Sequence, residues 1–456
     1  MADPLWTSDE IIAATGGRLS GSPFNVTGVS IDTRTLEPGD LFVALAGVRD
    51  GHEFVAPAMD ARAGGALVSQ GVSGPAVQVV DTLKALEKLG IAARDRSSAL
   101  RCAVTGSVGK TTATQAIASG LRLAGRAHSS IKSYNNHIGV PLTLARMPRA
   151  TERAVFEVGM NHADEITPLS RMIAPDVVIV TTVGPVHTEN FPDGEAGVAK
   201  AKAEIFAGLK PGGIAVLPAD NRWFNVLKAS ADRAGAQVVT FGTAPDCDAR
   251  LLSFEAQHVD AWVQGHPVAF SLRQTADHWG LTSLCILLAL EAMAVPREVA
   301  ITALADFEPL EGRGAEKQVG GFTLIDESYN ANPISMTSAI RTLGARPVSG
   351  RRVVALTDML ELGAEATGFH AAIAKDLDQA GIDLVFCAGP LMKHLWDNLP
   401  STQRGGYAGT AAELAPLVAA ALRPGDAIMV KGSNGSRAHL IARELAALGG
   451  GEGKGG

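Results

Sequence analysis

A glycine-rich turn between a short apolar run and a helix-compatible segment is the clearest chemical signal in the sequence. The run 101–104 leads into Thr105-Gly-Ser-Val-Gly-Lys-Thr-Thr112, and a helix is expected over 113–124. Gly106 and Gly109 would let backbone N–H groups approach phosphate oxygens, and a helix N-terminus adds the positive end of its dipole. The pattern is therefore typical of a strand–loop–helix phosphate cradle.

The two polar residues after the second glycine fit a nucleotide triphosphate. Lys110 can reach the terminal phosphates and the Thr111 hydroxyl can bind Mg²⁺. The loop is shorter than the common pattern, because Val104 stands where the first glycine of that pattern belongs. A chance glycine–lysine turn is the alternative, but the flanking strand and helix favour ATP. The expected ATP contacts in the loop are Gly106, Ser107, Val108, Gly109, Lys110, Thr111 and Thr112.

Two further side chains with metal-binding chemistry follow expected strands. Glu157 ends a strand at 153–156, and His187 follows a strand at 177–183. Ligands of parallel α/β sheets bind at the carboxyl ends of strands, and a carboxylate there is well placed to hold Mg²⁺. A solvated strand-end acid is an equal alternative for Glu157, and a lone loop histidine is usually incidental.

Lysine and asparagine pairs are the next candidates. Lys200 and Lys202 lie on an amphipathic segment, 194–209, where a lysine is normally a solvated charge. Asn135 and Asn136 offer two amides in a short turn, for which ordinary turn chemistry is the simpler explanation.

A polar run at 326–333 comes directly after an apolar strand, and Pro333 is suited to begin a helix. N-cap chemistry would account for part of this run, but not for its aromatic residue and both of its amides.

The elements that position these residues form three blocks. The central block alternates strands and helices, which indicates a mostly parallel sheet with helices on both faces, and a second such alternation follows it. Antiparallel strands are expected within 250–272, followed by a buried helix over 281–295. We expect an α/β chain of three domains, at 1–98, 99–313 and 314–448, with a disordered tail at 449–456. The strands expected from apolar runs are 66–68, 76–80, 101–104, 153–156, 177–181, 214–217, 322–325, 353–356, 384–387 and 427–430.

Composition fits a small-molecule enzyme. The chain has 456 residues, which suggests two to four domains, and its net charge of −7 argues against a nucleic-acid-binding surface. Its four cysteines form no CxxC pair, so structural zinc and disulfides are not expected and a reducing cytoplasm fits. The first 12 residues do not resemble a signal peptide, and the 281–295 segment is too short to span a bilayer.

Taken together, the motifs resemble the Mur ligase family of ATP-dependent amide-forming enzymes, and the resemblance covers nearly the whole chain. It is closest to the branch that joins D-alanyl-D-alanine to UDP-N-acetylmuramoyl-tripeptide. The 329–333 and 431–437 blocks together are specific for that branch, whereas the phosphate loop alone is a weak signal. The matching blocks are Ser30–Arg34, Leu41–Leu45, Asp50–His52, Thr105–Thr111, Asn135–Gly139, Glu157–Asn161, His187, Ala201–Glu204, Gly312–Arg313, Tyr329–Pro333, Met359–Gly363 and Lys431–Arg437.

The resemblance implies roles for individual positions. The first domain would bind the UDP-sugar peptide, the central domain ATP and Mg²⁺, and the Rossmann-like third domain would close on ATP and bind the incoming dipeptide. Implied catalytic residues are Lys110, Glu157, His187, Lys202 as a carbamate, and Arg313. Implied metal-binding residues are Thr111, Glu157, His187 and Lys202. Implied ATP contacts outside the loop are Asp326, Glu327, Tyr329 and Asn330. Implied substrate contacts are Ser30, Asp32, Thr33, Arg34, Asn135 and Asn136.

The implied reaction activates a peptide carboxylate. Transfer of the γ-phosphoryl group of ATP gives an acyl phosphate, which the amine of the dipeptide attacks, and water must be excluded meanwhile. One block departs from the family, because His278-Trp-Gly-Leu-Thr282 stands where His-Asn-x-x-Asn is common. Thr282 thus replaces an asparagine that the family places near adenine. We expect a cytoplasmic monomer with no nucleic-acid partner and no membrane insertion.

Three other functions fit parts of the pattern. A ligase that adds the third residue of the peptide usually carries an Asp-Asn-Pro-Arg block, which this sequence lacks. A folylpolyglutamate synthase-like ligase is a second alternative. A P-loop ATPase that regulates a partner without ligation belongs to a different functional class. Dependence of ADP release on an acceptor would separate the ligases from that ATPase.

Overall fold

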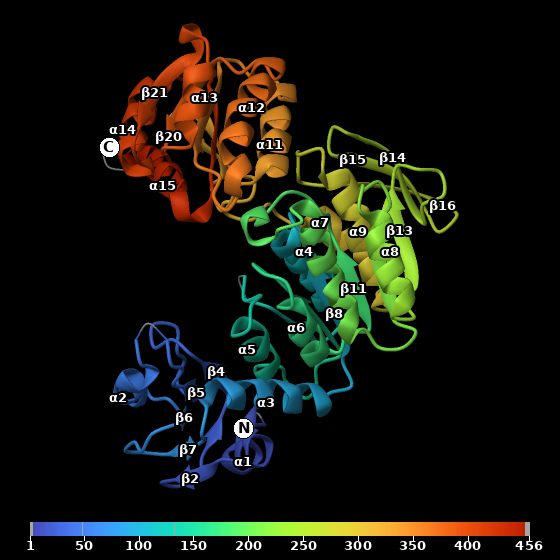
Figure 1. Cartoon of the computed structure of the whole chain (residues 1–456), viewed down its shortest axis with the longest axis vertical. Helices are drawn as coiled ribbons and strands as arrows, with labels where there is room; N and C mark the ends of the chain where they lie inside the picture. The colour runs from blue at the N-terminus through green and yellow to red at the C-terminus, as the bar shows by residue number, and fades with distance from the viewer. Residues whose placement is uncertain (1–2, 48, 132, 452–456) are drawn as a thin grey trace.

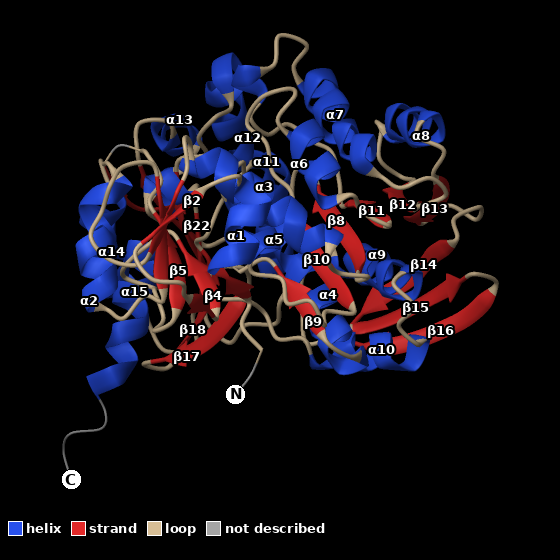
Figure 2. Cartoon of the chain, turned by 90° about the horizontal axis from the view of Figure 1, so that it is seen from below, coloured by secondary structure: helices blue, strands red, loops and turns tan. Residues whose placement is uncertain are grey.

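The computed structural model describes residues 3–47, 49–131 and 133–451. Within these ranges, three sheets of five, nine and six strands follow one another along the chain. Figure 1 shows the central unit between the N-terminal unit in blue and the C-terminal unit in orange and red. In each unit helices flank the strands (Figure 2). No helix in the described ranges is both long and apolar enough to cross a membrane.

The N-terminal unit is a small mixed sheet in the order β2-β7-β6-β5-β4, parallel except for β2. A two-stranded antiparallel sheet, β1-β3, lies beside it. Its elements are β1 (Trp6–Thr7), α1 (Ser8–Thr15), β2 (Arg18–Ser20), β3 (Asn25–Val26), β4 (Gly28–Ser30), β5 (Asp40–Val43), η1 (Gly51–Phe54), α2 (Val55–Asp60), β6 (Gly65–Val68), β7 (Ala76–Gln78) and α3 (Thr82–Asp95).

The central unit contains a nine-stranded sheet in the order β16-β15-β14-β13-β12-β11-β8-β10-β9. It is parallel from β9 to β14 and antiparallel from β14 to β16, as expected for residues 250–272. Its strands are β8 (Leu100–Thr105), β9 (Ala127–Ser129), β10 (Arg153–Glu157), β11 (Val177–Val180), β12 (Ile214–Pro218), β13 (Gln237–Gly242), β14 (Ala249–Glu255), β15 (His258–Val263) and β16 (His266–Ser271). Its helices are α4 (Lys110–Ala124), α5 (Gly139–Ala145), α6 (Ile166–Ile173), η2 (Thr188–Asn190), α7 (Glu195–Ala203), η3 (Glu204–Gly208), α8 (Phe224–Arg233), α9 (Trp279–Ala292) and α10 (Arg297–Asp306).

Burial on both faces explains the apolar strands of this sheet. One hydrophobic core lies under α4, α9 and α10, and a second lies under α5, α6, α7 and α8. Helix α9 is the buried helix that the sequence predicts. Strand β8 lies between β10 and β11, so the sheet grows from β8 to one side through β10 and to the other side through β11. The carboxyl end of β8 is therefore the topological switch point, the place where α/β sheets bind ligands.

The C-terminal unit has the strand order β17-β18-β22-β19-β20-β21, parallel except for β17. Helices α11 to α13 cover one face and α14 and α15 the other. Its elements are β17 (Ala315–Val319), β18 (Phe322–Glu327), α11 (Pro333–Ala345), β19 (Arg352–Thr357), η4 (Gly363–Glu365), α12 (Ala366–Gln379), β20 (Leu384–Ala388), α13 (Met392–Asn398), η5 (Ser401–Gln403), β21 (Arg404–Ala408), α14 (Ala411–Ala421), β22 (Ala427–Lys431), η6 (Asn434–Ser436), α15 (His439–Ala447) and η7 (Leu448–Gly451).

The N-terminal unit packs tightly against the central unit through α3 and α5. Gly90 allows the close approach, because a Cβ there would lie 3.0 Å from the carbonyl oxygen of Pro141. The Trp6 indole donates a hydrogen bond to the Ala145 carbonyl at 2.8 Å. These contacts fix the first unit to the helix that covers the phosphate-binding sheet.

The expected α/β architecture is confirmed: a small α/β unit, a central unit with a mostly parallel sheet and a C-terminal unit with a second such sheet follow one another. Of the expected tail, residues 449–451 belong to η7, and residues 452–456 lie outside the described ranges.

Candidate active site

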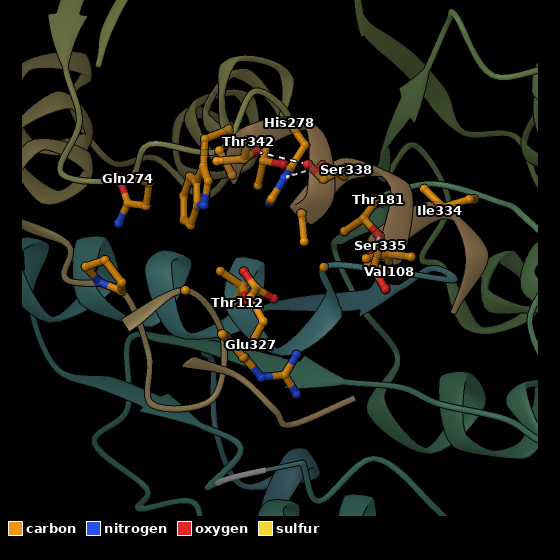
Figure 3. Close-up of a pocket in the computed structure, with 18 of the residues that line it drawn as sticks. Val108, Thr112, Thr181, Gln274, His278, Glu327, Ile334, Ser335, Ser338 and Thr342 are labelled. Carbon is orange, nitrogen blue, oxygen red and sulfur yellow. Dashed lines mark hydrogen bonds between the residues drawn. The ribbon is translucent and has the colours of Figure 1, made fainter. Parts of the chain in front are cut away.

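A cavity of about 1770 Å³ lies between the carboxyl ends of the central strands and the C-terminal unit. Figure 3 shows Thr112 and Glu327 facing His278, Ser338 and Thr342 across it. Thirteen of the sequence-predicted residues line this cavity: Ser107, Val108, Gly109, Lys110, Thr111, Thr112, Asn135, Glu157, His187, Arg313, Glu327, Tyr329 and Asn330.

The phosphate loop has the glycine-dependent geometry that its sequence predicts. Gly106 has φ +149°, and a Cβ there would lie 1.9 Å from Oγ1 of Thr181. Gly109 has φ +84° and begins α4 without a side-chain cap, which leaves the first N–H groups of the helix for a ligand. Lys110 Nζ folds back over the loop and donates to the Gly106 carbonyl at 2.7 Å. The loop therefore brings the first backbone amides of α4 and the Lys110 ammonium together, as a phosphate-binding site requires.

Ser107 holds the phosphate loop in place through hydrogen bonds to Gly184. Its hydroxyl donates to the Gly184 carbonyl at 3.0 Å and accepts from the Gly184 amide at 2.9 Å. These bonds tie the phosphate loop to the segment after β11, which leads to His187.

The charged group of the phosphate loop, the Lys110 ammonium, is buried. Burial lowers the pKa of Lys110, while Glu157 opposes that shift and Arg313 adds to it. The ammonium has no direct carboxylate partner within the described ranges, so a phosphate anion would supply the missing counter-charge.

Glu157 provides the carboxylate for a cation. It is 1% exposed at the end of β10, and its Oε1 accepts a hydrogen bond from Asn135 Nδ2 at 2.7 Å. Its Oε2 is buried with no hydrogen-bond partner in the described structure. Within the same ranges, no three His, Cys, Asp or Glu side chains form a ready-made metal site. A single orphaned carboxylate oxygen suits Mg²⁺, which binds through one or two carboxylates plus phosphates and water.

A polar network joins the phosphate loop to the third unit. Thr111 Oγ1 lies 3.2 Å from Ser133 Oγ, and it accepts from Arg313 Nη2 at 3.1 Å. Ser133 Oγ lies 2.7 Å from the Tyr329 hydroxyl, and the Arg313 guanidinium stacks 3.8 Å from the centre of the Tyr329 ring. Ser133 is a residue that sequence reasoning missed, because its partners Thr111 and Tyr329 lie far from it in the sequence.

Lys202 is buried beneath the site. The side chain is 1% exposed, and in the described ranges it forms no hydrogen bond or ion pair. Burial, and then Lys110, lower the pKa of Lys202 well below its usual value. Lys200, by contrast, is exposed and pairs with Asp193 at 2.7 Å. The solvated-lysine alternative therefore applies to Lys200 alone.

His187 has a carboxylate neighbour from the third unit. Its Nδ1 contacts the carboxylate of Glu361, a contact that the sequence did not reveal. Burial lowers the pKa of His187, Glu361 opposes that shift, and Lys110 and Lys202 reinforce it.

The end of β18 contributes one carboxylate to the cavity. Glu327 lines it and pairs at 3.2 Å with Lys431, whose ammonium also donates to the Asn330 carbonyl at 3.2 Å. Asp326 is not among the lining residues, and its Oδ1 accepts from the Ser328 amide at 3.1 Å. Adjacent strand residues point to opposite faces, so the structure favours Glu327 of these two candidates.

The predicted substrate residues of the first unit do not line this cavity. Ser30, Asp32, Thr33 and Arg34 lie at and after the end of β4, where Arg34 forms a two-pronged pair with Asp32 at 2.6–2.9 Å. Asn136 also lies outside the lining, and its Oδ1 accepts from the amides of residues 138 and 139 before α5.

Residues 278–282, the block that departs from the family motif, lie at the other end of the cavity. Thr282 lines it from the first turn of α9. Trp279 is buried against Phe307, with ring centres 5.8 Å apart, and takes no polar role. His278 Nδ1 lies 3.4 Å from Ser338 Oγ on α11, so both units meet at this end as well.

Comparison with known proteins agrees with this geometry. The family model of the Mur ligase middle domain matches residues 104–287, and that of the Mur ligase, glutamate ligase domain matches residues 312–434. The UDP-N-acetylmuramoyl-tripeptide–D-alanyl-D-alanine ligase of Escherichia coli K12 is 35% identical over 84% of this chain and 86% of its own length. The ligase of the same name from Bacillus subtilis is 31% identical over 92% of this chain and 93% of its own.

The fold agrees as well. A crystal structure of MurF from Acinetobacter baumannii superimposes with a TM-score of 0.86 at 25% identity, covering 98% of this chain and 99% of that one. The two domain models, the two relatives and the superposition all agree: the chain belongs to the Mur ligase family, and both relatives carry the name of its D-alanyl-D-alanine-adding branch.

Proposed function

We propose that this protein is an ATP-dependent ligase that joins D-alanyl-D-alanine to UDP-N-acetylmuramoyl-tripeptide during peptidoglycan precursor synthesis. The observation that supports this best is the cavity in which an uncapped phosphate loop faces Arg313, at the boundary between the units, and Tyr329 of the adjoining unit. Near full-length similarity to ligases of that name supports the substrate pair.

Phosphoryl transfer would be promoted by charge held in place before the reaction. Lys110 and Arg313 line the cavity at the uncapped start of α4, where they and the first amides of the helix would surround the terminal phosphate and stabilise charge on the transferring group. Tyr329 holds the Arg313 guanidinium by stacking, which reduces the cost of ordering that side chain. The product, an acyl phosphate, must be shielded from water, and docking of the C-terminal unit provides the cover.

Mg²⁺, when bound, would neutralise phosphate charge and orient the phosphoryl group. The Thr111 hydroxyl and the orphaned Glu157 oxygen are hard oxygen ligands that suit it. An imidazole suits Mg²⁺ less well, so His187 would act best on metal-bound water.

Lys202 would act as a carbamate. Its neutral amine would attack CO₂, a C–N bond would form, and one proton would leave, giving an N-carboxylate in place of a cation. Burial and the neighbouring Lys110 favour the neutral amine that this reaction requires. The resulting anion would offset Lys110 and support the metal.

The three units would divide the substrates. We propose that Ser30, Asp32, Thr33 and Arg34 hold the UDP-sugar, with Asn135 and Asn136 near the peptide. We further propose that the C-terminal unit receives the dipeptide and that Glu327, the one of the two candidate carboxylates that lines the cavity, holds the ribose. We also propose that the protein is a monomer, and that it works in the cytoplasm, where a reducing environment fits its four free cysteines.

An acceptor panel tests this proposal. ADP formation should require Mg²⁺, the tripeptide nucleotide and D-alanyl-D-alanine together. A diamino acid with the dipeptide nucleotide, or glutamate with a folate, should give no ADP. ATP turnover without any acceptor would instead identify the regulatory ATPase.

A further inference from the structure

One carboxylate of the C-terminal unit reaches the histidine of the central cavity. Glu361 lies in the loop between β19 and η4, and its side chain contacts Nδ1 of His187. His187 comes from the loop after β11 and lines the cavity. The contact therefore joins the nucleotide-binding unit to the unit that covers it.

The backbone is unusual on both sides of this contact. The φ angle is +55° at His187 and +64° at Glu361, a left-handed conformation that is unfavourable for a non-glycine residue. Such conformations persist where surrounding structure holds them, and they cluster at functional sites. Two of them meeting across one interface indicate a contact that both loops are built to make.

Neighbouring residues bring the two loops together. The Thr188 hydroxyl donates to the Leu362 carbonyl at 3.4 Å. Gly363 has φ +59°, and a Cβ there would lie 3.1 Å from Cα of Glu189. Nearby, a Cβ on Gly184 would lie 2.0 Å from Cδ1 of Ile334, so the absence of a side chain admits the first turn of α11.

We propose that Glu361 is a positioning residue for His187. By pairing with Nδ1–H, which has no other partner among the described residues, its carboxylate favours the tautomer that leaves Nε2 as an acceptor for the metal–nucleotide site. A carboxylate on the second ring nitrogen is the usual device for orienting a histidine at a metal site and for raising its basicity. Because the carboxylate belongs to the C-terminal unit, the metal site is complete only when that unit is docked. The inference rests on the proposed function for the identity of the ligands.

Binding of a non-hydrolysable ATP analogue, measured by calorimetry with and without Mg²⁺, tests the proposal without any turnover. We expect Glu361→Ala to weaken analogue binding about tenfold or more in Mg²⁺, the range seen for loss of such partners. Without Mg²⁺ its affinity should match that of the unaltered protein. Glu361→Gln keeps an acceptor for Nδ1–H but no charge, so it should restore part of the loss. Glu365→Ala, at an exposed glutamate four residues on, is the matched control and should change neither value.

A double-mutant cycle tests whether Glu361 acts through His187. With His187 already replaced by alanine, Glu361→Ala should cause no further loss in Mg²⁺. Equal weakening with and without Mg²⁺, an undiminished loss in the His187→Ala background, or no difference from Glu365→Ala would each overturn the proposal. Failure of the proposed function would look different, because the unaltered protein would then form no acceptor-dependent ADP while its Mg²⁺-dependent nucleotide binding persisted.

Discussion

Replacing Lys202 by methionine should remove most ligase activity while leaving the fold intact. Methionine keeps an unbranched side chain of similar length in a site where lysine is 1% exposed, so no large cavity forms. A buried amine without a hydrogen-bond partner adds little to stability, so removing it should not lower the free energy of unfolding. Thermal unfolding of Lys202→Met is therefore expected at or above the temperature of the unaltered protein.

The size of the activity loss separates two states of the lysine. A carbamate would place a negative charge beside Lys110 and the metal, and loss of one preorganised electrostatic group typically costs about 10²–10³-fold in kcat, or ~3–4 kcal/mol. A bare neutral amine, which the lowered pKa also permits, contributes little charge, so its loss should cost less than about tenfold. The matched control is Lys200→Met, since the exposed pair with Asp193 is worth at most about 1 kcal/mol and lies outside the cavity.

The assay combines kcat with a direct probe of the modification. Protein equilibrated with ¹³C-labelled bicarbonate should show one carbamate carbon resonance that is absent from Lys202→Met. Lys202→Ala should regain part of its activity when a short carboxylate is added, because the anion can occupy the vacated position. Near-normal kcat in Lys202→Met, or full activity of the unaltered protein after CO₂ is stripped with no labelled resonance, would refute the reasoning.

Three other changes test separate parts of the molecule. Lys110→Ala should lower kcat by about 10²-fold or more, ~3 kcal/mol, with an unchanged melting temperature; near-normal turnover in the folded variant would contradict the phosphate role. Asp32→Ala or Arg34→Ala should raise KM for the UDP-sugar peptide with little change in kcat, and a rise in KM for ATP instead would show the domain roles to be wrong. Burial lowers the pKa of His128 from 6.5 to about 4, although its Nε2 donates to the Thr143 carbonyl at 2.8 Å. The unfolded chain binds this proton below about pH 6.5 and the folded chain does not, so up to about 3 kcal/mol of stability should be lost between pH 6.5 and 4; His128→Gln should remove that part of the pH dependence in denaturant titrations.

Local chemistry could be predicted from the sequence where it depends on a single segment. The turn around Gly106 and Gly109 requires positive φ angles, and the positions of Glu157 and His187 after buried strands follow from the alternation of strands and helices. The structure places Gly109, Glu157 and His187 around one cavity, while their assigned roles stay predictions.

Contacts that depend on docking could not be predicted in this way. Ser133 and Tyr329 are 196 residues apart, and Glu361 meets His187 only through the approach of two units. The choice between Asp326 and Glu327 depended on which face of β18 turns to the cavity, and a polar run of sequence does not show that.

The packing of α3 against α5 has a consequence for how the chain unfolds. Leu142 and Ala145 of α5 belong to the same hydrophobic cluster as Leu86 and Leu89 of α3, so that core crosses the boundary near residue 98. The clusters of the C-terminal unit are built from residues after 314 alone. We therefore expect two cooperative units: residues 1–98 would lack part of their own core when excised, whereas the C-terminal unit carries a complete one and should melt independently.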